Sequence, residues 1–126
     1  HPDKIVGVSD DHALLARLDG EIAAALGQDV TVGRSQPYYL DITAPRANKG
    51  DGVAALAAAI GVPLANVAVL GDERNDLPMF ARAGLSIAMG QGPDAVRAAA
   101  DRVTRSNEED GVAHAIDEII LPEAAP

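Results

Sequence analysis

Two carboxylates and a carboxamide follow an apolar run near the middle of the chain. Asp72, Asn75 and Asp76 come after residues 67–70, which have the length and composition of a buried strand, and Gly71 ends that run. At the carboxyl end of such a strand, open α/β sheets bind their ligands. Oxygen donors of this kind suit Mg²⁺. The spacing also allows a simpler interpretation, in which Asp76 caps the next helix and Asp72 merely ends the strand.

A lysine near the start of a predicted helix is the second candidate. Lys49 follows Asn48, which we expect to cap that helix. A lysine at a helix N-terminus combines a positive side chain with unpaired backbone N–H groups, which suits a phosphate. A Mg²⁺ ion held by Asp72 would neutralise more of the phosphate charge. We therefore predict that Lys49 and Asp72 lie within about one water molecule of each other.

Alternating strands and helices must position these side chains. After Asn48 we predict a helix ending at Gly61, then strands at residues 67–70 and 85–89 and an edge strand at residues 102–104. Helices are predicted up to about residue 83, from residue 93, and after residue 110. This order predicts a parallel sheet covered by helices on both faces.

The chain before Asn48 has a different pattern. Residues 4–8 predict a strand, and a stripe of period 3.6 predicts a helix that begins after Asp10 or Asp11 and closes at Gly27. Residues around 30–32 and 38–43 alternate between polar and apolar, which predicts a hairpin with one face in water.

Composition narrows the class of protein. The 126 residues are about one domain's worth of chain, and 48% are hydrophobic but only 2% aromatic, so the core must be aliphatic. A net charge of −9 repels phosphate backbones, so nucleic acid is not an expected partner. The sequence contains no apolar run of membrane-spanning length and no signal-peptide pattern, so we expect a soluble cytoplasmic protein with no membrane partner.

Six short motifs occur in a fixed order and carry a family resemblance. They are Lys49-Gly50, Gly71-Asp72-x-x-Asn75-Asp76, Ala83-Gly84, Ala88-Met89-Gly90, Ala100-Asp101-Arg102-Val103-Thr104 and Asp110-Gly111-Val112-Ala113. With them, residues 38–121 resemble the carboxy-terminal part of a haloacid dehalogenase superfamily phosphatase of the Cof type (class IIB). The resemblance implies an α/β fold, with the rear of an α+β cap at residues 1–45. Residues 46–126 would form the distal half of a Rossmann-like core with a parallel sheet.

The resemblance also implies roles for individual residues. Lys49 would orient the phosphoryl group and the nucleophile, Asp72 would ligate Mg²⁺, and Asp76 would support the metal site as a second metal-binding residue. Asn75 would shape the loop and contribute to phosphate binding. Arg46 is a candidate for substrate contact, although an exposed hairpin arginine is the simpler interpretation.

The nucleophile motif of this family is missing. Enzymes of the family attack phosphate with an aspartate in an Asp-x-Asp-Gly-Thr loop, and the nearest string here, residues 17–21, has Arg17 at that place inside a predicted helix. We therefore expect part of a phosphatase of small phosphorylated metabolites, inactive alone, whose first half or a second copy (a dimer) covers the edge of strand 67–70. The alternative is a non-catalytic binding fragment. Asn107 lies in a predicted solvated cap, and the family pattern keeps it as a candidate.

Overall fold

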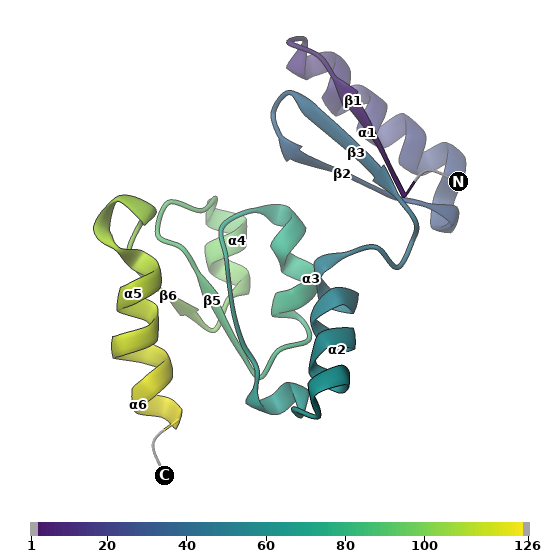
Figure 1. The fold of residues 1–126 in the computed structure, drawn as a ribbon. Helices are drawn as coiled ribbons and strands as arrows, with labels where there is room; N and C mark the ends of the chain where they lie inside the picture. The colour runs from purple at the N-terminus through teal and green to yellow at the C-terminus, as the bar shows by residue number, and fades with distance from the viewer. Residues whose placement is uncertain (1–2, 125–126) are drawn as a thin grey trace. The chain divides into compact units, whose positions relative to one another are not determined.

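The computed structural model describes residues 3–124, and the chain divides into two compact units after Asn48 (Figure 1). The sequence analysis predicted a boundary after residue 45, which would put Arg46 in the second unit. With the division after Asn48, Arg46 lies in the first unit. Among residues 3–124, no helix is long and apolar enough to cross a membrane.

The first unit is a three-stranded antiparallel sheet with one helix. Its elements are β1 (Lys4–Val8), α1 (His12–Leu26), a 3-10 turn (Gly27–Asp29), β2 (Thr31–Gln36) and β3 (Tyr39–Thr43), with strand order β1-β3-β2. Asp11 Oδ1 accepts the N–H of Leu14 at 2.9 Å and so caps α1, and Gly27 ends it with a φ of 55°. The core of the unit contains Leu15 of α1 and Leu40 of β3, both buried. The strands, helix and caps predicted here are confirmed.

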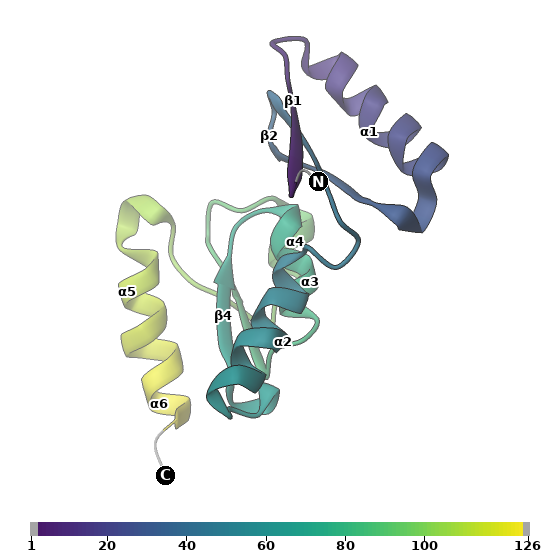
Figure 2. The same cartoon turned by 45° about the vertical axis from the view of Figure 1, so that its right-hand side comes forward.

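The second unit is built on a parallel sheet, as predicted, and the order of its strands is β4-β5-β6. Its strands are β4 (Ala68–Gly71), β5 (Leu85–Ala88) and β6 (Arg102–Val103). Its α-helices are α2 (Lys49–Ile60), α3 (Leu77–Phe80), α4 (Asp94–Ala99), α5 (Gly111–Ala115) and α6 (Leu121–Ala124). Three 3-10 turns (Leu64–Asn66, Arg74–Asp76 and Asn107–Glu109) and a π-helical turn (Ile116–Ile120) complete it. Figures 1 and 2 both show α2 and α3 on one side of this sheet and α5–α6 on the other.

A small, mostly aliphatic core holds the second unit together. Its buried cluster consists of Val69, Met79, Phe80, Ala88 and Val96. Burying such side chains stabilises a fold by about 25 cal/mol per Å² of apolar area, and through Val69 this cluster holds β4 against the rest of the unit. The strand β4 lies at the edge of the sheet: in the part of the chain that the structure describes, it pairs with β5 only.

Two helices differ from the expectation. The helix predicted to reach about residue 83 ends at Phe80, because Gly84 turns to donate its N–H to Leu64 O at 2.8 Å. The last helix contains a π-helical turn, in which Leu121 donates to Ile116 O, five residues back. Pro122 follows, and proline has no N–H to continue a regular ladder.

Candidate functional site

The loop after β4 turns around a buried carboxylate. A Cβ atom on Gly71 would lie 2.5 Å from Asp76 Cβ, so any larger residue at position 71 would displace Asp76. This contact explains why the motif begins with glycine. The 3-10 turn at residues 74–76 then brings Asp76 beneath the end of the strand, where its side chain is only 2% exposed.

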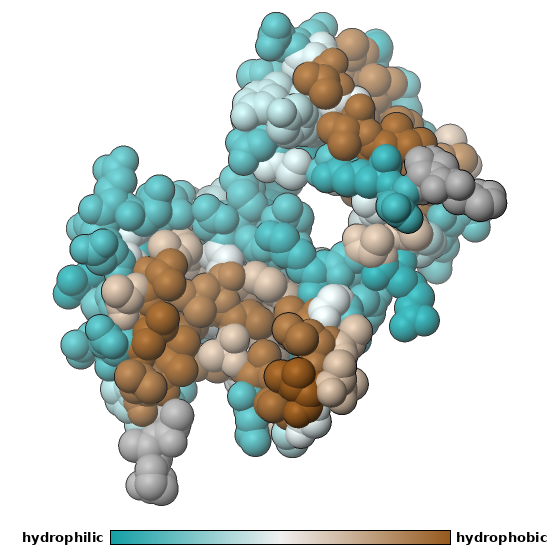
Figure 3. Space-filling model, in the orientation of Figure 1, coloured by the Kyte–Doolittle hydropathy of each residue, from teal (hydrophilic) through white to brown (hydrophobic). Residues whose placement is uncertain are grey.

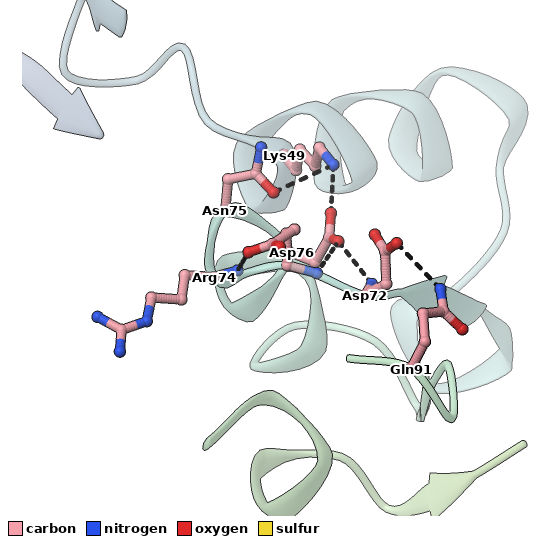
Figure 4. A network of polar contacts seen from close by, with 7 residues as sticks. Lys49, Asp72, Arg74, Asn75, Asp76 and Gln91 are labelled. Atoms are coloured by element: carbon pink, nitrogen blue, oxygen red, sulfur yellow. Dashed lines mark hydrogen bonds and ion pairs between the residues drawn. The ribbon is translucent and has the colours of Figure 1, made fainter. Parts of the chain in front are cut away.

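Asp76 uses both carboxylate oxygens within the protein. Its Oδ2 accepts the backbone N–H groups of Asp72 at 2.9 Å and Glu73 at 3.0 Å, and its Oδ1 forms an ion pair with Lys49 Nζ (Figure 4). A buried charge is tolerated when it is paired and hydrogen-bonded in this way. The simpler interpretation, in which Asp76 caps the next helix, is wrong, because its side chain makes no capping bond to α3. Asp76 instead closes the 3-10 turn before that helix, and in addition it fixes the ammonium group of Lys49.

The start of α2 is held against the next helix. A Cβ on Gly50 would lie 2.3 Å from Pro78 O, so only glycine allows the two backbones to approach this closely. Lys49, the first residue of α2, is thereby placed beside the loop, with Nζ also 3.5 Å from Asn75 Oδ1. The Lys49 side chain remains 51% exposed, which leaves its charge accessible to an anion from solution.

Asp72 differs from Asp76 in having an available oxygen. Its residue is exposed, and its Oδ2 accepts a hydrogen bond from Gln91 Nε2 at 3.1 Å. Among residues 3–124, no group donates a hydrogen bond to Asp72 Oδ1. Lys49 and Asp72 are joined through Asp76, whose two oxygens bind the ammonium of one and the N–H of the other. Their direct approach within one water molecule stays a prediction.

Two further predicted site residues, Asn107 and Arg46, lie in different parts of the chain, and a residue that was not predicted, Gln91, contacts Asp72. Gln91, which sequence reasoning missed, also accepts the N–H of Asn107 at 3.0 Å through Oε1, so Asn107 reaches the site through its backbone. The available signal for Gln91 was its place in the loop that follows β5, at the same sheet edge as Asp72. Arg46 lies in a turn of the first unit with an exposed side chain, and its contact with substrate stays a prediction.

Two further carboxylates of the second unit, Asp101 and Glu109, each accept hydrogen bonds from a serine. The hydroxyl and N–H of Ser86 donate to Asp101 Oδ2 at 2.7 and 2.9 Å, and these bonds lower the pKa of Asp101 below its usual value. Bonds from Ser106 lower the pKa of Glu109 in the same way, first through the hydroxyl and then through the backbone. Such bonds stabilise the ionised carboxylate.

The donor set fits a Mg²⁺ ion only in part. Among residues 3–124, no group of three or more His, Cys, Asp and Glu side chains is arranged to hold a metal ion. Protein sites for Mg²⁺ commonly supply only one or two carboxylates, and water and phosphate oxygens complete the octahedron. The free oxygen of Asp72 fits one such position. The oxygens of Asp76 are already bonded, so its predicted ligation of Mg²⁺ stays a prediction.

Known proteins are similar to this chain in sequence and in fold. The YxeH protein of Bacillus subtilis is 40% identical over 107 residues, which are 85% of this chain and 40% of YxeH. The 5-amino-6-(5-phospho-D-ribitylamino)uracil phosphatase YcsE of Bacillus subtilis is 36% identical over 94 residues, which are 75% of this chain and 38% of YcsE. A solved haloacid dehalogenase-like hydrolase from B. subtilis superposes with a TM-score of 0.83 at 30% identity, over 94% of this chain and 42% of that chain.

The chain therefore spans about 40% of the length of the curated relatives it matches. The family model for haloacid dehalogenase-like hydrolases matches residues 1–116, and the resemblance drawn from the six motifs is confirmed. The chain belongs to the haloacid dehalogenase-like hydrolase family.

Proposed function

We propose that this chain supplies the phosphate-orienting and metal-binding part of a Mg²⁺-dependent phosphatase of small phosphorylated metabolites. The observation that carries the proposal is the pairing of Lys49 with buried Asp76, at the same strand end where Asp72 has a free oxygen. An ammonium group and a cation-binding carboxylate at one edge suit a phosphate monoester. The relative YcsE is named as a phosphatase of a phosphorylated small molecule, which supports this substrate class.

The proposed chemistry divides the work between residues. Lys49, held by Asp76, would bind a non-bridging phosphoryl oxygen, and Asp72 would hold a Mg²⁺ ion, whose charge would offset the remaining negative charge of the phosphate. An aspartate from outside this chain attacks phosphorus and the P–O bond to the ester oxygen breaks, so that this oxygen leaves with the bonding electrons and takes a proton from water to become the alcohol. Water then cleaves the aspartyl phosphate, which releases inorganic phosphate and regenerates the carboxylate. Asn75 contacts Lys49 and keeps the loop in place.

The nucleophile would arrive on a segment that covers the open side of the second unit. Within residues 3–124, the outer edge of β4 has no strand partner, and an edge of this kind is a template for another strand. Large apolar side chains are exposed on both flanks, at Leu56, Ile60, Val112, Ile116 and Leu121. Figure 3 shows these apolar surfaces over α2 and α5–α6, and a groove of about 430 Å³ lies beside α5. The occupant we propose is the remainder of a protein of the relatives' length.

A joined protein tests the proposal. The 126-residue chain alone is expected to release no phosphate from an aryl phosphate. It is also expected to self-associate, as measured by light scattering, because the apolar side chains on its flanks are exposed to solvent. Joined to the portion of YcsE outside the matched 94 residues, it is expected to be monomeric and active with Mg²⁺. In that joined protein, Asp72→Asn and Lys49→Met are each expected to lower kcat by about 100-fold or more.

The control is Asp117→Asn, at an exposed aspartate of the π-helical turn, which is expected to leave the rate unchanged. Turnover by the 126-residue chain alone, or a joined Asp72→Asn protein as active as its parent, would contradict the proposal. A folded joined protein that binds inorganic phosphate but never releases it from an ester would favour the non-catalytic binding fragment.

A further inference from the structure

The side-chain amide of Gln91 is hydrogen-bonded at both ends. Nε2 donates to Asp72 Oδ2 at 3.1 Å, and Oε1 accepts the N–H of Asn107 at 3.0 Å. Figure 4 shows the amide turned toward the Asp72 carboxylate. The opposite orientation would place an oxygen against the carboxylate and an NH₂ group against an N–H donor, so the two partners together select one orientation.

The backbone on either side of Gln91 is anchored as well. The guanidinium of Arg97 donates to Gly90 O at 3.0 Å and to Gly92 O at 2.9 Å, so both neighbouring carbonyls are held by one side chain. A Cβ on Gly92 would lie 3.0 Å from Asp72 O, which shows how closely this loop packs on the backbone of Asp72. The Gln91 amide therefore projects from a fixed base.

We infer that Gln91 is a positioning residue that holds the Asp72 carboxylate in one rotamer. An exposed aspartate without such a partner samples several χ1 rotamers, and a ligand carboxylate that is ordered beforehand loses less entropy when it binds. Because Gln91 engages Oδ2, it leaves Oδ1 free for a cation. The same amide couples Asp72 to the 3-10 turn that begins at Asn107. The orientation stands on geometry alone, and its consequence for a cation rests on the proposed function.

Gln91→Met removes both hydrogen bonds and keeps the length of the side chain. In NMR spectra of the 126-residue chain, three-bond couplings are expected to report one χ1 rotamer for Asp72 in the parent and averaged rotamers in the variant. Hydrogen exchange of the Asn107 amide is expected to accelerate. Gln28→Met, at an exposed glutamine of the first unit, is the matched control and should change neither signal.

A second variant separates the two bonds. Gln91→Glu keeps an oxygen for the N–H of Asn107 but loses the donor to Asp72 and adds a like charge beside it. We expect slow exchange at Asn107 to persist while Asp72 becomes rotationally averaged. A single Asp72 rotamer in both Gln91 variants, with Asn107 exchange unchanged in Gln91→Met, would overturn the inference.

Titration with Mg²⁺ alone, followed by amide shifts of residues 71–76, links the inference to the cation. Gln91→Met is expected to raise the Kd for Mg²⁺ by about ten-fold, which is the size of effect expected when the hydrogen-bond partner of a metal ligand is removed. Asp72→Asn is expected to abolish the shifts. If Asp72→Asn leaves them unchanged, the proposed metal site is wrong, and the rotamer and exchange data still decide the role of Gln91.

Discussion

Charged side chains are arranged differently in the two units. In the first unit they form pairs whose side chains are partly exposed: Lys4 Nζ lies 3.0 Å from Asp41 Oδ1, with the Asp41 side chain 17% exposed, and Arg34 Nε lies 4.0 Å from Asp19 Oδ2. In the second unit a buried carboxylate, Asp76, gathers a lysine and two backbone N–H groups at one strand end. Exposed pairs contribute little to stability or chemistry, whereas a buried group with several donors fixes a geometry.

The direction of the strands explains this difference. In the antiparallel sheet of the first unit, neighbouring strands end at opposite edges, so polar residues that follow them are separated. In the parallel sheet, β4 and β5 end at the same edge, where Asp72 and Gln91 meet. A set of convergent polar groups is thus favoured in the second unit by topology alone.

Among the predicted effects, glycine substitutions should give the largest difference in stability between the two units. Gly71→Ala forces a Cβ into Asp76, 2.5 Å away, and we expect about 2–3 kcal/mol of destabilisation of the second unit. Gly33→Ala in the first unit is the matched control, because a Cβ there meets nothing within 4 Å, and its effect should be within about 0.5 kcal/mol. Urea unfolding followed by amide exchange in each unit measures both. Equal costs would mean that the Asp76 contact does not constrain position 71.

The two lysines of the chain sharpen the same contrast. Lys49→Met leaves the 2%-exposed Asp76 without a counter-charge but with two N–H donors, so we expect a loss of about 1–2 kcal/mol in the second unit. Lys4→Met removes the ion pair with Asp41, whose side chain is 17% exposed against 2% for Asp76, so a smaller loss of less than about 1 kcal/mol is expected. The denaturation midpoints of both variants, compared with that of the parent, measure these two losses of stability. A larger loss for Lys4→Met would contradict the distinction between buried and surface pairing.

The sequence predicted the parts of this arrangement that depend on order along the chain. The strand before Asp72, the helix that begins at Lys49 and the parallel sheet follow from local patterns, and the structure confirms them. Gln91 could not be identified, because its role depends on contacts with Asp72 and Asn107, nineteen and sixteen positions away. The pairing of Lys49 with Asp76 depends equally on the close approach that Gly50 permits at Pro78, which no periodicity encodes.

The smallest predicted effect is a pH dependence of stability that is confined to the surroundings of Asp101. Hydrogen bonds from Ser86, first from its hydroxyl and then from its N–H, hold the pKa of Asp101 below the value of 3.8 expected for a free aspartate. The unfolded chain therefore binds a proton at higher pH than the folded one. The stabilisation is complete above the unfolded pKa and is lost as the pH falls through the lower folded pKa.

Ser86→Ala removes the hydroxyl donor, and its bond to the N–H of Asp101 with it. The stability gap between parent and variant in β5, measured by amide exchange, should therefore be widest above about pH 5 and narrow towards about pH 3. Ser35→Ala in the first unit is the control and should show no such pH dependence. A gap for Ser86→Ala that stays constant over this range would mean that the serine contributes packing but no preference for the ionised carboxylate, and the bracing of the second unit would then be independent of charge.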